Sequence, residues 1–228
     1  MSGHSKWSTI KRKKGKTDAE RAKVFTKIGR EMTVAVREGG PDPAVNSKLR
    51  DLIAKAKSNN VPNDNIDRVI KKAAGGGDKN NYETNIYEGY GPNGVAVIVE
   101  CLTDNKNRTA GDIRHYFDKF GGNLGTSGCV SFMFTKKGIV IVENNGVDED
   151  TIMEDAFEFG ADDMSVEDEV VEISCEPSEL GTLREGLVSK GYNVVSAEVD
   201  QIPSTYTTLT DEEHIKKMNL LLEHLEDN

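Results

Sequence analysis

Six cationic side chains and one aromatic ring fall within residues 1–16, and no carboxylate accompanies them. The cations are Lys6, Lys11, Arg12, Lys13, Lys14 and Lys16, and the ring is Trp7. Lysine and arginine neutralise phosphates and release condensed counterions, and an indole can stack on an unpaired base. A solubilising tail is the alternative, but a basic tail is unexpected on a chain that is strongly acidic elsewhere. The pattern therefore predicts that this basic arm binds nucleic acid.

The first predicted helix extends the basic surface. Thr17-Asp18-Ala19-Glu20 fits a capping box, and Gly39-Gly40 ends the helical periodicity after about Glu38. The apolar residues share one face of a helical wheel: Phe25, Ile28, Met32, Ala35 and Val36. Four cations lie nearly opposite and are predicted to contact phosphates: Lys23, Lys27, Arg30 and Arg37.

The residue types that usually carry catalysis or bind metals form no local motif. His4, His115, His214 and His224 are scattered, and none has a second His or a Cys at metal-ligand spacing. The glycines of 75–77 lack the Lys-Ser/Thr ending of a phosphate-binding loop, and those of 121–125 follow a predicted helix rather than a strand. The sequence thus predicts no catalytic residue, no metal and no cofactor, and an enzyme with an unrecognised site is a remote alternative.

The net charge of -10 conceals two regions of opposite sign. Residues 1–76 hold 18 basic and 8 acidic side chains, a balance of +10, whereas residues 77–228 hold 11 and 31, a balance of -20. Such asymmetry indicates separate domains with different partners. The three cysteines stand far apart, the N-terminus has no apolar signal core, and no apolar run approaches the ~20 residues that span a bilayer. We therefore expect a cytoplasmic protein that contacts no membrane.

Three amphipathic helices are predicted for residues 1–76. Asp42-Pro43 begins the second, with Asp42 as its cap and an apolar stripe made of Val45, Leu49, Leu52, Ile53 and Ala56. The third follows Pro62, and its inward residues are Ile66, Val69, Ile70 and Ala73. Because Gly75-Gly76-Gly77 interrupts the pattern, we expect a small helical domain that ends at residue 76.

The remaining residues mix strands and helices. Apolar runs over 86–90 and 95–102 flank Gly91-Pro92-Asn93-Gly94 and predict a hairpin, followed by a helix over 108–120 and a strand over 129–134. Residues 136–200 then follow the order βαββαβ of a ferredoxin-like unit, with strands over 139–142, near 164, over 170–174 and over 192–199 and helices over 149–159 and 177–190. A strand over 205–209 and a helix over 211–225 lack a core of their own.

The predicted fold class is therefore α+β and multidomain. We expect an N-terminal three-helix domain with its basic arm (1–76), a central α+β domain in two pieces (77–135 and 201–228), and an acidic ferredoxin-like domain inserted into it (136–200).

Two further features each admit two interpretations. Residues 138–183 hold 15 acidic and no basic side chains, which makes either a solvated surface or a docking face for a basic protein or for the basic domain of the same chain. The run from Asp104 to Thr109 either caps the following helix or presents Arg108 to a phosphate. Arg108 is therefore a secondary candidate for contact with nucleic acid.

Several motifs, in order over residues 3–134, resemble the YebC/PmpR family, which includes the mitochondrial translational activators. They are Gly3-His4-Ser5-Lys6-Trp7, Arg37-Glu38-Gly39-Gly40-Pro41-Asp42-Pro43, Glu88-Gly89-Tyr90-Gly91-Pro92, Asn105-Lys106-Asn107-Arg108-Thr109, Gly121-Gly122-Asn123-Leu124-Gly125 and Gly128-Cys129-Val130. The resemblance implies a cytoplasmic protein with an N-terminal helical domain and two α+β domains around a central cavity. The short segment before Gly3 implies a bacterial member, and the family supplies no catalytic residue to carry over.

The resemblance implies a non-enzymatic regulator of gene expression. Family members are described as DNA-binding transcriptional regulators, and they also resemble translation factors that engage the ribosome and relieve stalling at proline-rich stretches. Asn46, Ser47 and Lys48 lie near the start of the second helix, but nothing marks it as a recognition helix, and a basic arm with Trp7 suits RNA at least as well. The predicted partners are therefore DNA, in a transcription regulator, or alternatively ribosomal RNA and the ribosome.

Overall fold

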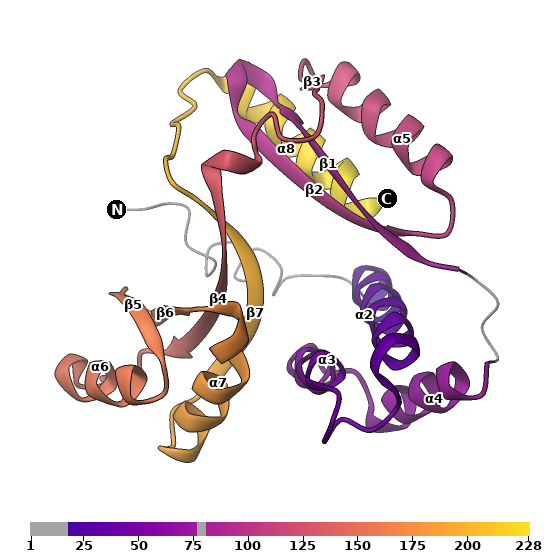
Figure 1. Ribbon diagram of the computed structural model, residues 1–228. Helices are drawn as coiled ribbons and strands as arrows, with labels where there is room; N and C mark the ends of the chain where they lie inside the picture. The colour runs from indigo at the N-terminus through magenta and orange to yellow at the C-terminus, as the bar shows by residue number, and fades with distance from the viewer. Residues whose placement is uncertain (1–17, 77–80) are drawn as a thin grey trace. The chain divides into compact units, whose positions relative to one another are not determined.

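The computed structural model describes residues 18–76 and 81–228, whose helices and strands are drawn in Figure 1. They form an N-terminal three-helix domain and an α+β region with two antiparallel sheets. The chain divides into two compact units. The first joins the N-terminal helices to residues 136–201, and the second joins residues 81–135 to residues 202–228. Both units are therefore discontinuous in sequence.

The N-terminal domain consists of α2 (Asp18–Gly39), α3 (Ser47–Ser58) and α4 (Asn63–Ala74). Both α3 and α4 pack against α2. Their apolar stripes meet in one core, which contains Ile28, Met32, Ala35, Val36, Leu49, Ala56, Ile66 and Ala73. The three predicted helices are confirmed. Apolar residues that repeat with the helical period of 3.6 lie on one face of a helix, and each helix buries that face in the shared core.

The start of α3 differs from the prediction. The helix begins at Ser47, and Asp42 instead stabilises a turn that precedes it. Asn46 is the cap, since its side-chain oxygen accepts a hydrogen bond from an amide in the first turn of the helix. Val45 lies outside the helix with 80% of its surface exposed, so its predicted place in the apolar stripe is wrong. The predicted cap, Asp42, is therefore wrong, because the contact of the Asn46 side chain with the end of α2 places the cap at Asn46.

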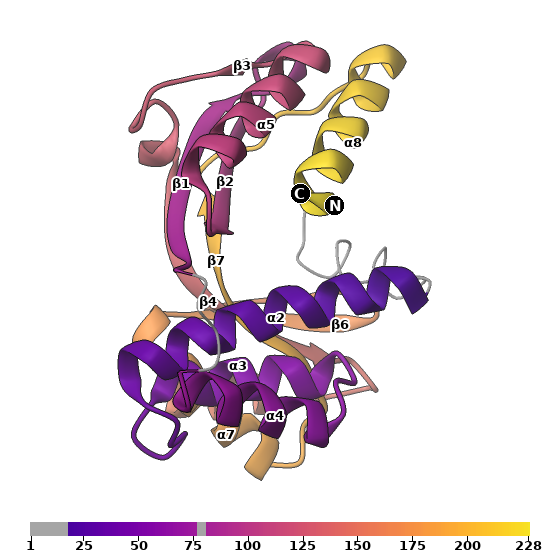
Figure 2. The same cartoon turned by 90° about the vertical axis from the view of Figure 1, so that its right-hand side faces the viewer.

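The second unit is built on a hairpin. β1 (Glu83–Tyr90) and β2 (Ala96–Thr103) pair antiparallel across the 3-10 turn η1 (Pro92–Gly94), and β3 (Asn123–Leu124) pairs with the other edge of β1. Figure 2 shows α5 (Lys106–Lys119) and α8 (Glu212–Asp227) side by side on one face of this sheet. The buried side chains of its core are Val97, Ile113, Phe117, Phe120 and Leu221.

Two strands predicted in this unit are not formed. Residues 129–134 make a loop and the 3-10 turn η2 (Ser131–Met133) before the next strand begins, and residues 205–209 have no regular structure. The first difference has a physical cause, because the backbone amides of Gly128, Val130 and Ser131 donate to the Glu88 carboxylate instead of to a neighbouring strand.

The ferredoxin-like part follows the predicted order of elements. These are β4 (Phe134–Glu143), α6 (Glu149–Glu158), β5 (Ala161–Val166), β6 (Val170–Cys175), η3 (Pro177–Glu179), α7 (Leu180–Ser189) and β7 (Val194–Pro203). The sheet order is β5-β6-β4-β7, as in a split βαβ motif. β4 and β7 run antiparallel, since backbone hydrogen bonds join Glu143 to Asn193 at one end and Met133 to Ser204 at the other.

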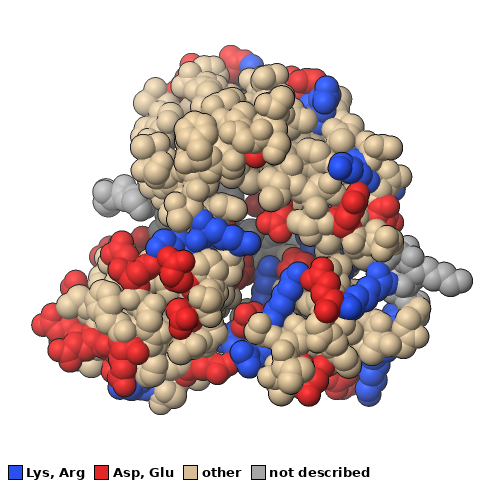
Figure 3. Space-filling view, in the orientation of Figure 1, with Lys and Arg blue, Asp and Glu red and all other residues tan. Residues whose placement is uncertain are grey.

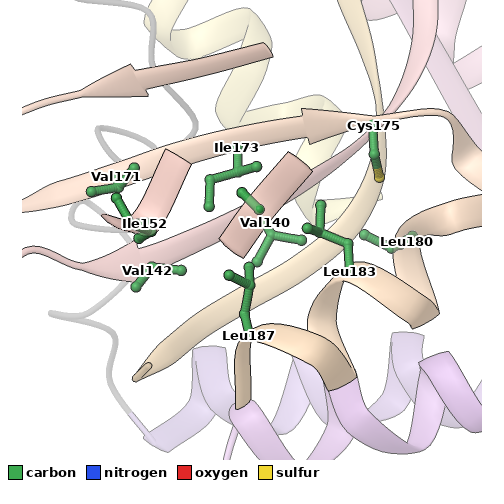
Figure 4. Close-up of a cluster of buried hydrophobic side chains, with 10 residues drawn as sticks. Val140, Val142, Ile152, Val171, Ile173, Cys175, Leu180, Leu183 and Leu187 are labelled. Carbon is green, nitrogen blue, oxygen red and sulfur yellow. The ribbon is translucent and has the colours of Figure 1, made fainter. Parts of the chain in front are cut away.

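One face of this sheet is buried under α6 and α7. Figure 4 shows side chains of β4 and β6 meeting those of the two helices, among them Val140, Ile173, Ile152, Leu183 and Leu187. β4 and β7 are longer than predicted. They extend beyond the apolar runs because hydrogen bonding between the two strands continues through their polar ends.

Candidate nucleic-acid interface

The four predicted cations of α2, here called the basic face, lie along one side of the helix. Lys23, Arg30 and Arg37 are exposed and Lys27 is half-buried, whereas Ile28 on the opposite side is 2% exposed. Three of these cations are seven residues apart, which spaces them by about 10.5 Å along the helix axis. The basic face thus extends over roughly 21 Å, a length in which a nucleic acid presents several phosphates.

The predicted basic arm lies outside the described residues. These candidates are Lys6, Trp7, Lys11, Arg12, Lys13, Lys14 and Lys16, together with the Thr17 position of the predicted capping box. The structure therefore places four of the eleven primary candidates, and it brings those four together on α2.

The start of α3 is engaged by contacts within the domain. The Asn46 side chain is 6% exposed, and its amide nitrogen donates to the carbonyl oxygens of Ala35 and Gly40, each at 2.8 Å. The Lys48 ammonium forms an ion pair with Glu38 at 2.9 Å. A recognition helix reads bases with polar side chains near its N-terminus. In α3, two of the side chains in that position already serve the fold.

Arg50 is engaged as well. Its Nε lies 3.7 Å from a carboxylate oxygen of Glu185, which Arg184 also approaches at 3.2 Å. Arg184 in turn forms an ion pair with Asp51 at 3.0 Å, and its side chain is only 11% exposed. These four residues form one charge network between α3 and α7, so Arg50 serves a contact within the first unit.

The loop before α5 caps that helix. The Asn105 side chain accepts a hydrogen bond from the Arg108 amide at 3.0 Å, and the hydroxyls of Thr109 and Thr103 bond to each other at 2.9 Å. The Arg108 guanidinium is paired with Asp104 at 2.7 Å, yet 60% of the Arg108 side-chain surface is exposed. A phosphate would compete with Asp104 for this group.

Carboxylates cover much of the ferredoxin-like part, as the red atoms over α6 and β5 in Figure 3 show. Some of them hold the fold together. Asp155 accepts hydrogen bonds from Lys190 and from Tyr192, each at 2.7 Å, and these bonds keep the pKa of Asp155 below its usual value. Burial and the bond to Asp155 raise the pKa of Tyr192 to about 12. A surface of this sign disfavours direct contact with phosphates.

A buried carboxylate that the sequence analysis did not anticipate organises the second unit. Glu88 of β1 is 5% exposed, and one of its oxygens accepts from the Gly128 amide at 2.8 Å. The other oxygen accepts from the amides of Val130 and Ser131 at 2.9 and 2.8 Å. These bonds, led by those from Gly128 and Val130, lower the pKa of Glu88 despite its burial. The sequence carried one signal of this role, since Glu88 is an acidic residue within a run that is otherwise apolar and typical of a strand.

The described part of the chain offers no metal centre. Residues 18–76 and 81–228 contain no group of three or more His, Cys, Asp or Glu side chains arranged to hold a metal ion. Cys101, Cys129 and Cys175 form no disulfide with one another, and burial raises the pKa of the Cys175 thiol to about 11. Over the same ranges, no helix has both the length and the apolar character required to cross a bilayer.

Two family models match nearly all of the chain. Residues 5–76 match the TACO1/YebC protein N-terminal domain, and residues 82–228 match the TACO1/YebC second and third domain. Two relatives named "Probable transcriptional regulatory protein" are each 60% identical over the whole of this chain, which covers 92% of the one from Ruminiclostridium cellulolyticum and 94% of the one from Acetivibrio thermocellus. The chain also resembles the crystal structure of a conserved hypothetical protein, Aq1575 from Aquifex aeolicus, with a TM-score of 0.83 and 45% sequence identity. The match covers 93% of this chain and 88% of that one. The resemblance of the motifs is thereby confirmed, and the chain belongs to the TACO1/YebC family.

Proposed function

We propose that this chain is a non-enzymatic regulator of gene expression that binds nucleic acid through residues 1–76. The observation that carries the proposal is the segregation of charge on α2, where the basic face lies opposite the buried stripe. Cations in this arrangement can approach a phosphate backbone together, and each contact releases counterions.

The acidic residues of α2 support the same proposal. Glu31 and Glu38 are paired with Lys55 and Lys48 of α3, at 3.3 and 2.9 Å. Both carboxylates are thus directed towards α3. The lysines of α3 neutralise their negative charge, which limits the repulsion between these carboxylates and a phosphate bound at the basic face.

DNA is the first target that we propose, and the relatives named as probable transcriptional regulatory proteins support it. Ribosomal RNA, bound by a translation factor, is the second candidate. The engagement of Asn46 and Lys48 within the domain favours it, because two of the polar side chains at the start of α3 are then occupied and are not available to read the major groove. Binding through phosphates and unpaired bases suits RNA.

The test measures affinity of the full-length protein by fluorescence anisotropy, on duplex DNA and on a ribosomal-RNA hairpin. A variant with Lys23, Lys27, Arg30 and Arg37 all replaced by Ala should bind its better ligand at least tenfold more weakly. Its circular dichroism should be unchanged, since these residues lie outside the core.

The matched control removes four exposed cations that lie elsewhere in the same domain: Lys57, Arg68, Lys71 and Lys72. Both variants change the net charge equally, so an equal loss of affinity would mean that only the overall charge matters. Undiminished binding by the α2 variant would remove the proposed surface. Sedimentation of the cellular protein with ribosomes or with DNA-bound material decides between the two targets.

A further inference from the structure

Phe132 exposes 77% of its surface, more than any other Phe, Tyr or Trp side chain in the part of the chain that the structure describes. The backbone on both sides of it is held in place. The Ser131 amide donates to Glu88 at 2.8 Å, and the Met133 amide donates to the Val130 carbonyl at 2.9 Å. The Met133 carbonyl also accepts from an amide at 2.8 Å. Phe132 is therefore directed into solvent by a fixed backbone.

The loop that leads to Phe132, residues 125–131, is held by the second unit at several further points. Glu88 accepts from two more amides of the loop, and its own carbonyl accepts from the Gly125 amide at 2.8 Å. The Tyr90 hydroxyl donates to the Cys129 carbonyl at 3.2 Å, and Val130 is fully buried. A loop fixed before its ligand arrives loses little conformational entropy on binding.

The surroundings of Phe132 carry no exposed negative charge from their own segment. The 24 residues between Asp118 and Glu143 contain no Asp or Glu and three Lys, on a chain in which 39 of 228 residues are acidic. The carboxylate that does bind the loop, Glu88, is 5% exposed and has both oxygens occupied by amides. Thr126 and Ser127 are exposed hydroxyl-bearing residues of the loop, whereas the Ser131 side chain forms a hydrogen bond with Glu88.

We propose that the loop 125–131, together with Phe132, is a second nucleic-acid contact, in which the Phe132 ring stacks on an unpaired base of single-stranded RNA. Aromatic rings on a rigid support bind bases of any sequence through their faces, and neighbouring hydroxyls can bond to phosphate or ribose oxygens. The inference rests on the proposed function and adds to it a site in the second unit. Glu88 is a positioning residue for this site, because it acts through the loop.

The experiment compares full-length variants on a single-stranded RNA 12-mer that contains 2-aminopurine and on a duplex DNA. Phe132→Ala should weaken binding to the RNA by about 5- to 150-fold, the range that corresponds to ~1–3 kcal/mol per stacked base. Duplex binding should stay within about twofold, because paired bases expose no face. The part of the 2-aminopurine quenching that depends on stacking should disappear.

Two substitutions separate stacking from plain hydrophobic contact. Phe132→Tyr keeps an aromatic face and should bind as the wild type does, whereas Phe132→Leu keeps apolar area without the ring and should bind as poorly as Phe132→Ala. Phe157→Ala is the matched control, since Phe157 is also exposed, at 49%, but lies among carboxylates on α6. It should change neither affinity.

Glu88→Gln tests the positioning role. It should weaken RNA binding while the dependence of affinity on salt keeps its slope, because no phosphate-binding cation is lost. An unchanged affinity in Phe132→Ala overturns the inference, and equal binding by Phe132→Leu and the wild type would identify a protein-docking residue instead. In either case the proposed function stands if the α2 variant still loses affinity, so the two failures are distinguishable.

Discussion

Arg184 of α7 donates a hydrogen bond to Asp51 of α3 at 3.0 Å. The polarity of this pair is the reverse of the net charges of the two regions, because the acidic ferredoxin-like part supplies the cation and the basic helical domain supplies the carboxylate. Arg184 is also the first basic residue after the acidic stretch of residues 138–183. The contact between α3 and α7 thus includes a specific pair and is more than the attraction of two oppositely charged surfaces.

A double-mutant cycle with Asp51→Asn and Arg184→Leu should give a coupling free energy of about 1–2 kcal/mol. This exceeds the usual value for exposed pairs because Arg184 is 11% exposed. Hydrogen exchange of the α3 amides measures it. The exposed pair of Lys48 and Glu38 is the control, with an expected coupling below about 0.5 kcal/mol. Equal coupling in the two pairs would contradict the prediction.

The Glu88 carboxylate should make the stability of the second unit depend on pH. Hydrogen bonds lower its pKa in the folded state, so its contribution is present above the pKa of the unfolded chain, about 4.3, and is lost as the pH falls through the folded-state value. The difference in Tm between the wild type and Glu88→Gln should be constant from pH 8 to 6 and shrink below about pH 4.5. Glu100→Gln, at an exposed position of β2, controls for the loss of one charge. A difference that persists unchanged to pH 3 would rule out the carboxylate as its source.

Gly89 should be intolerant of a side chain because of its packing. A Cβ there would lie 2.5 Å from the Asn123 carbonyl oxygen and 2.8 Å from the Phe117 ring, so Gly89→Ala is expected to destabilise the protein by roughly 1–3 kcal/mol in urea unfolding. Gly111 in α5 has nothing within 4 Å of the same position. Gly111→Ala should therefore stabilise by about 0.5–1 kcal/mol, as expected for a helix interior. Similar losses at both positions would mean that the close approach at Gly89 is not the cause.

Salt should reveal how many cations of residues 1–76 meet phosphates. If four to six do so, the logarithm of the affinity for duplex DNA should fall with the logarithm of salt concentration at a slope of roughly -3.6 to -5.4. Replacing Lys11, Arg12, Lys13 and Lys14 by Ala should weaken binding and flatten that slope. Unchanged binding by this variant of the arm would direct attention to Arg108.

Trp7→Ala should cost about 1–3 kcal/mol of binding free energy on single-stranded RNA and little on duplex DNA if the indole stacks on a base. Equal losses on both ligands would assign Trp7 to packing.

Local patterns in the sequence determined most of the elements. The apolar periods of α2, α3 and α4 and the Gly91–Gly94 turn between two β-rich runs specify these elements over a few residues. All four elements are confirmed, although α3 starts later than predicted and its stripe does not include Val45. The order βαββαβ also predicted the sheet of the ferredoxin-like part. The segregation of cations from the apolar stripe of α2 could be read in the same way, because a helical wheel needs only local spacing.

Contacts between distant residues decided the rest. Asn46 caps α3 because its amide group also reaches Ala35, eleven residues away, and this contact moved the start of the helix from Asp42. Glu88 meets amides some 40 residues later and so turns a predicted strand into the loop that exposes Phe132. No local pattern in the sequence predicts these pairs, because a backbone amide can donate its hydrogen bond either to a carbonyl of a neighbouring strand or to a carboxylate. Only the folded chain determines which acceptor lies within reach.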